Sequence, residues 1–205
     1  MTAASLEFGR LKAKLQTLLL ASTADDVPPK CWAIACGDLE TALTVFHATI
    51  GTISRAITKL SLVGKMAPEP EAAASISAEL SELCEQLSSS VTVAAHCGAG
   101  APMRELYSKA ANRVVNSTIE VATTLEQQKW DEVAPATGKV WEACEAVTKL
   151  PKTNKASYKR KLLAFCVELK ATAPPASPLR VRHIILRNLR PFERTGSNHG
   201  VQRKN

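Results

Sequence analysis

Cysteine and histidine are the residues of this chain that could bind a metal ion. The sequence contains six cysteines and four histidines. A structural zinc site needs four ligands, usually in two closely spaced pairs. No two cysteines have C-x-x-C spacing, and the adjacent His96 and Cys97 have no second pair at ligand distance in the sequence. We therefore predict no metal site and no cofactor, and we expect free thiols that are mostly buried. The cysteines are Cys31, Cys36, Cys84, Cys97, Cys144 and Cys166.

A cysteine nucleophile would need a histidine within hydrogen-bonding distance. Cys36 and His47 are eleven residues apart, and on one helix this spacing separates them by about 16 Å. The sequence also has no glycine-rich phosphate loop of the GxxxxGK or GxGxxG type. We interpret Gly98-Ala99-Gly100 as the end of a helix. The sequence therefore predicts that the protein is not an enzyme.

The positive charge of the chain is unevenly distributed. The net charge is +7, and residues 174–205 contribute +6 of it through seven basic residues and one acid. This composition predicts a flexible basic tail, and we expect any nucleic-acid contact to be made through it alone. A second basic group surrounds the start of the last predicted helix. We interpret it as a solvated helix surface, with a phosphate-binding or nuclear-import face as the alternative. This candidate basic surface consists of Lys152, Lys159, Arg160 and Lys161, with Lys155 beside them.

Apolar residues recur at every third or fourth position along most of the chain, which predicts helices. No segment alternates like a strand, and the connections are short, so neighbouring helices are expected to pack antiparallel. We predict an all-α fold in which residues 1–173 form an antiparallel bundle of five to six helices and residues 174–205 form the tail. The expected helices span residues 6–22, 31–63, 72–96, 102–125, 131–150 and 154–172.

Three details of this pattern carry specific expectations. The third predicted helix has a heptad-like seam that consists of Ile76, Leu80, Leu83, Leu87, Val91 and Ala94. Gly51 lies inside the second helix, where we expect a bend or close packing. We interpret the three tryptophans as packing residues near helix ends. They are Trp32, Trp130 and Trp141.

With these segments defined, residues 140–173 resemble the N-terminal half of the cyclin-D-binding proteins, also called Grap- and cyclin-D-interacting or Maid-type proteins. In that family, a Val-Trp-x-Ala-Cys run is followed by a proline, an Asn-Lys-Ala run and a patterned helix containing a lysine. The resemblance extends over about residues 30–173. The motif positions here are Val140, Trp141, Ala143, Cys144, Pro151, Asn154, Lys155, Ala156 and Lys170.

The resemblance implies bundled helices, binding to D-type cyclins or helix-loop-helix transcription factors, and negative regulation of the cell cycle. It also implies a location in the cytoplasm and the nucleus. No apolar run reaches the roughly 20 residues of a membrane span, so we expect no membrane contact. The family continues into an acidic stretch and a second helical portion, whereas this chain continues into the basic tail. The alternatives are therefore a nucleic-acid-associated helical protein or a truncated, inactive isoform, and exposed apolar surface would favour self-association.

Overall fold

The computed structural model describes residues 3–21, 38–65 and 70–172, and every regular element within these ranges is an α-helix. This confirms the predicted all-α fold. The predicted basic tail, Trp32, Cys31, Cys36 and the first residues of the predicted second helix lie outside the described residues. The helices are α1 (Ala3–Ala21), α2 (Leu39–Lys65), α3 (Pro70–His96), α4 (Ala101–Glu126), α5 (Trp130–Thr148) and α6 (Asn154–Thr172).

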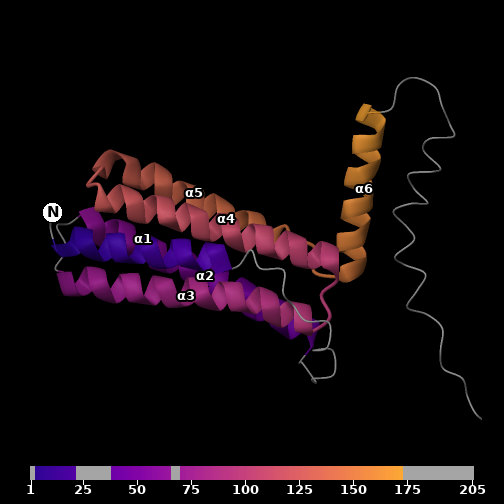
Figure 1. Cartoon of the computed structure of the whole chain (residues 1–205), viewed down its shortest axis with the longest axis horizontal. Helices are drawn as coiled ribbons and strands as arrows, with labels where there is room; N and C mark the ends of the chain where they lie inside the picture. The colour runs from indigo at the N-terminus through magenta and orange to yellow at the C-terminus, as the bar shows by residue number, and fades with distance from the viewer. Residues whose placement is uncertain (1–2, 22–37, 66–69, 173–205) are drawn as a thin grey trace, which may run out of the picture. The chain divides into compact units, whose positions relative to one another are not determined.

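The chain divides into two compact units, one of residues 1–158 and one of residues 159–205. Helices α1 to α5 lie side by side in the first unit (Figure 1). Within it, α2 packs on α3, α4 packs on α5, α1 packs on both α3 and α4, and α2 also contacts α5. Helix α6 begins in the first unit and continues into the second. The domain prediction of one bundle through residue 173 stays a prediction.

Short, well-defined turns connect the later helices. Helix α3 is followed by Gly98, whose φ of 93° lies in the left-handed region that glycine adopts without strain. Pro102 lies in the first turn of α4, where its missing N–H is not needed. Between α4 and α5, Gln128 has a φ of 56°, which is uncommon for a residue with a side chain. These turns precede α4 and α5 and fix where those two helices begin.

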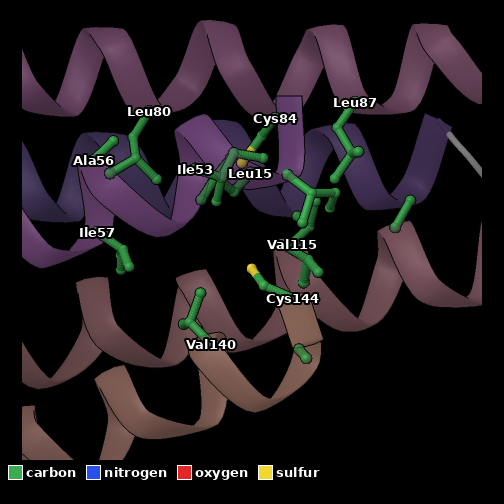
Figure 2. Packing of buried hydrophobic residues seen from close by; sticks show 14 of the residues in the cluster. Leu15, Ile53, Ala56, Ile57, Leu80, Cys84, Leu87, Val115, Val140 and Cys144 are labelled. Carbon is green, nitrogen blue, oxygen red and sulfur yellow. The ribbon is translucent and has the colours of Figure 1, made fainter. Parts of the chain in front are cut away.

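The core lies between the helices of the first unit. Its largest fully buried side chains include Phe8 of α1, Phe46 of α2 and Tyr107 of α4. Figure 2 shows a further part of the core, where Leu15, Ile53, Leu80 and Val140 come from four different helices. Each fully buried side chain of this kind contributes roughly 1.5–3 kcal/mol to folding. The apolar stripes that we predicted from the sequence thus supply most of this core.

The predicted seam of α3 faces the core, because Leu80, Leu87 and Ala94 are buried and the other three seam residues pack against the core. Ile76, Leu83 and Val91 are only partly buried, while Ser77 and Ser81 are buried. Ser90 is also buried, and its hydroxyl donates a hydrogen bond to the Leu87 carbonyl of its own helix. The buried Ser77 hydroxyl, by contrast, has no hydrogen-bond partner in the described part of the chain. A hydropathy pattern ranks serine as a surface residue, so the buried serines beside the predicted seam were not expected.

Candidate functional site

Three of the predicted motif residues belong to the core. Val140, Ala143 and Cys144 are buried on one face of α5, and Figure 2 shows Val140 and Cys144 pointing toward core residues of the other helices. Burial raises the pKa of the Cys144 thiol to about 11. Burial, followed by the charges of Cys144 and Glu85, raises the pKa of the Cys84 thiol to about 12. A thiol that stays protonated is a poor nucleophile, so these cysteines act as packing residues.

The motif residue Asn154 connects the start of α6 to the turn between α3 and α4. Its Oδ1 accepts a hydrogen bond from the Gly100 N–H at 2.7 Å, and its Nδ2 donates one to the Gly98 carbonyl at 2.8 Å. The ring of Tyr158 lies close to Gly100, because a Cβ added there would lie 3.1 Å from the Tyr158 Cε2 atom. Thr153 caps α6 by accepting a hydrogen bond from the Ala156 N–H at 3.2 Å. This part of the motif therefore holds local structure in place.

Trp141 is the motif residue that faces outward. It lies in the middle of α5 with 47% of its surface exposed, and its indole N–H donates a hydrogen bond to Oγ1 of Thr58 on α2 at 3.3 Å. The interpretation of Trp141 as a packing residue near a helix end is therefore wrong. Trp130 does lie at the first residue of α5 and is 43% exposed. Leu62, one turn along α2 from Thr58, is also exposed.

Two glycines lie on the same sides of α2 and α5 as these residues. Gly51 precedes Thr58 by two turns, and Gly138 precedes Trp141 by one turn. In the described part of the chain, nothing lies within 4 Å of a Cβ built on either glycine. A Cβ built on Gly64 would instead lie 2.5 Å from Leu125 Cδ2, so that glycine is needed for packing. The close packing expected at Gly51 is thus not made by the described chain.

We refer to Gly51, Thr58, Leu62, Gly138 and Trp141 as the Trp141 surface. Glycine inside a helix destabilises it by roughly 0.5–1 kcal/mol relative to alanine. At Gly51 and Gly138 no contact within the described residues offsets this cost. A half-exposed tryptophan beside two open glycine positions makes the Trp141 surface a candidate for docking a partner.

A small cavity between α2 and α3 is a second candidate surface. Its volume is about 260 Å³, and its lining includes Val45 and Ala42 of α2 and Val93 of α3, with Cys97 near the end of α3. Val45 and Val93 are both exposed. Such a cavity could accept one apolar side chain of a partner. Nothing in its composition selects a particular ligand.

The remaining predicted site residues surround the start of α6. Pro151 is partly buried and its carbonyl accepts a hydrogen bond from the Tyr107 hydroxyl at 3.5 Å. Tyr107 also lies 3.4 Å from His47 Nε2. Burial and the charge of Lys152 lower the pKa of His47 below 6.5. The structure places the following predicted residues in exposed positions: Lys152, Lys155, Ala156, Lys159, Arg160, Lys161 and Lys170.

Among residues 3–21, 38–65 and 70–172, no group of three or more histidine, cysteine or acidic residues could hold a metal ion. No helix in these ranges has the length and apolarity of a membrane span. The expectation of mostly buried thiols is wrong for Cys166, which is exposed on α6.

The sequence was compared with known families, curated proteins and solved structures. A family model described as "Grap2 and cyclin-D-interacting, N-terminal" matches residues 46–172. The matched region starts in α2 and ends at the last residue of α6. It therefore includes all five residues of the Trp141 surface. No curated protein and no solved structure matches the chain.

Proposed function

This chain belongs to the Grap2 and cyclin-D-interacting protein family, and on that premise we propose that it is a non-catalytic regulator that binds a D-type cyclin through the Trp141 surface. In this proposal it restrains cell-cycle progression and acts in the cytoplasm and the nucleus. The family description supplies the class of partner. The half-exposed Trp141 is the observation that supports placing the binding surface here.

Trp141 has the properties of a binding anchor. Tryptophan is enriched among the few interface residues that carry most of the binding energy. The hydrogen bond to Thr58 satisfies its indole N–H and fixes the ring on α2. The exposed part of the ring can therefore be buried by a partner without leaving a polar group unpaired.

The open positions at Gly51 and Gly138 support the same location. A partner helix can lie closest to this surface where the side chain is absent. Adding a methyl group at either position removes a destabilising glycine from the chain but introduces an atom between the two partners. Stability and binding should therefore change in opposite directions, which a purely structural role for these glycines does not predict.

The test is a titration of the purified chain with a purified D-type cyclin, monitored by isothermal calorimetry. We expect Trp141→Ala to weaken binding by about 30-fold or more, the effect of losing a hot-spot residue. Trp130→Ala is the matched control, because Trp130 is similarly exposed on the same helix. Circular dichroism should show both variants folded.

The outcomes separate the partner from the surface. If the cyclin does not bind the unmodified chain above background, the proposed partner is wrong. If it binds and both tryptophan variants retain full affinity, the partner is right and the Trp141 surface is wrong. Trp141→Phe should recover part of the affinity, because the apolar ring returns without the indole N–H.

A further inference from the structure

From residue 159 onward, α6 has one broad face on which exposed apolar and basic side chains lie together. At about 100° of turn per residue, this face covers about 160° of the helix surface. We call it the basic face of α6, and all of its residues are exposed. In order around the helix they are Leu162, Cys166, Lys159, Lys170, Leu163, Val167 and Arg160.

The charges of the basic face are all positive and are not neutralised by other described residues. Lys159, Arg160 and Lys170 take part in none of the ion pairs between residues that the structure describes. The acid of this segment, Glu168, lies on the opposite side of the helix together with Lys161, and both interact within the chain. A surface that is electrostatically complementary to the basic face is therefore acidic.

Along the helix, the charges lie at the two ends of the face and the apolar side chains lie between them. Two basic residues precede Leu162, and Lys170 follows Val167. Leu162 and Leu163 are each 58% exposed, and Val167 is 66% exposed. At a rise of 1.5 Å per residue, the face from residue 159 to residue 170 is about 17 Å long. A complementary surface of this length has an apolar middle and carboxylates at both ends.

The positions of the lysines distinguish between the partners that could cover this face. A helix that lies on a membrane carries its basic residues on the face opposite the apolar one, whereas Lys159 and Lys170 point between the directions of Leu162 and Leu163. A nucleic acid would neutralise the charges but would leave the leucines exposed. A flat neighbouring helix covers a stripe of about 100°, which is narrower than this face. A concave, acidic protein surface can bury the leucines and pair with the charges at once.

We propose that the basic face of α6 binds in the apolar groove of an acidic protein, the kind of groove with which Ca²⁺-loaded calmodulin holds basic helices. Leu162, Leu163 and Val167 enter the groove, and carboxylates at its ends pair with the basic residues. Because α6 is helical before it binds, the partner does not have to order it. This binding is separate from that of the cyclin and does not involve the Trp141 surface.

Ca²⁺-loaded calmodulin is the probe, and its binding to the purified full chain is followed by isothermal calorimetry. We expect a dissociation constant in the micromolar range or tighter. Removing Ca²⁺ with EGTA closes the groove but leaves calmodulin acidic, so it should weaken binding by about 30-fold or more. The basic residues of segment 174–205 are present in both conditions. Their attraction to an acidic protein therefore does not account for a dependence on Ca²⁺.

Leu163→Asp and Ala164→Asp are matched variants of α6. Each adds one negative charge at an exposed position, but only Leu163 belongs to the basic face. Leu163→Asp should weaken calmodulin binding by about tenfold or more, and Ala164→Asp should leave it within about threefold. Both variants should retain their helical circular dichroism. Bound calmodulin should also slow the labelling of Cys166 by N-ethylmaleimide by about tenfold, because this thiol lies on the same face.

The proposal is overturned if Ca²⁺-loaded calmodulin does not bind at about 100 μM, if EGTA leaves the affinity unchanged, or if the two aspartate variants lose affinity equally. Vesicles that contain phosphatidylserine test the membrane alternative. If the chain binds these vesicles, loses that binding in Leu163→Asp and does not bind calmodulin, the face belongs to a membrane and the proposal is wrong. Trp141→Ala should leave calmodulin binding unchanged, which separates this proposal from the cyclin proposal.

Discussion

Helices α5 and α6 have the same length and the same number of apolar residues, but they bury these residues to very different extents. Each has 19 residues, and both contain the same number of apolar residues. In α5, Val133, Val140 and Val147 recur every seven residues and are all buried on one face. In α6, apolar residues are spread around the helix, and Leu162, Leu163 and Val167 are all exposed. Apolar content predicts that a helix forms, whereas its distribution around the helix decides what can cover it.

The largest expected difference concerns the thiols of the two helices. Cys144 of α5 is buried and its pKa is raised to about 11, whereas Cys166 of α6 is exposed. Since the thiolate is the reactive form and must be reached by the reagent, N-ethylmaleimide at pH 7.5 should label Cys166 about 100-fold faster or more. Peptide mass spectrometry over time measures both rates. In urea the rates should converge, and equal rates in the native protein would contradict the burial of Cys144.

A matched pair of valines compares the two helices in their contribution to the free energy of unfolding. Val140 of α5 is fully buried and Val167 of α6 is 66% exposed. Val140→Ala removes buried methyl groups and leaves a cavity, so we expect it to lower the free energy of unfolding by roughly 1–3 kcal/mol. Val167→Ala should change it by less than about 0.5 kcal/mol.

Urea unfolding at a protein concentration that keeps the chain monomeric measures both valine variants. Both variants replace a helical valine with alanine, so the change in helix propensity contributes equally to the free energy of unfolding of each. Comparable losses at the two positions would show that α6 is covered in solution by something that buries Val167.

The two kinds of glycine should respond to alanine with opposite signs. Gly64→Ala places a methyl group against Leu125, and we expect a loss of roughly 1–3 kcal/mol. Gly138→Ala adds a methyl group in open space on α5 and should stabilise the chain by roughly 0.5–1 kcal/mol. Thermal unfolding followed by circular dichroism compares the two. A destabilised Gly138→Ala variant would mean that this position is packed.

The smallest expected effect is a pH dependence beside the connection between α5 and α6. Burial and then Lys152 lower the pKa of His47 below its unfolded value of 6.5, so the folded chain favours the neutral imidazole. As the pH falls below 6.5, His47 is protonated in the unfolded chain at a higher pH than in the folded chain. The stability from His47 is therefore complete above pH 6.5 and is lost as the pH falls toward the lowered folded pKa.

Unfolding midpoints between pH 7.5 and pH 5 measure this dependence. His47→Gln should flatten the slope in that window, because the titrating group is absent. Lys152→Ala should flatten it only partly, since burial is the larger cause. An unchanged slope in His47→Gln would assign the pH dependence to other groups.

Much of the fold could be predicted from apolar spacing, but the burial of individual faces could not. The six helices and residues such as Val133, Val140 and Val147 follow from a period that hydropathy reports directly. Ser77 and Ser81 were missed because their burial depends on the close approach of neighbouring helices, which no single helix specifies. Trp141 was misassigned because tryptophan is usually counted toward a core. Its exposure is visible only when the register of α5 against α2 is known.

Asn154 has a consequence beyond holding two helices together. Its side-chain amide accepts a hydrogen bond from the Gly100 N–H and donates one to the Gly98 carbonyl. Gly98 has a φ of 93°, so both backbone groups belong to a turn and not to a helix. One side chain thus pairs a backbone donor and a backbone acceptor that lie outside the helices. Aspartate matches its shape but cannot donate, so it would place a negative charge against the Gly98 carbonyl.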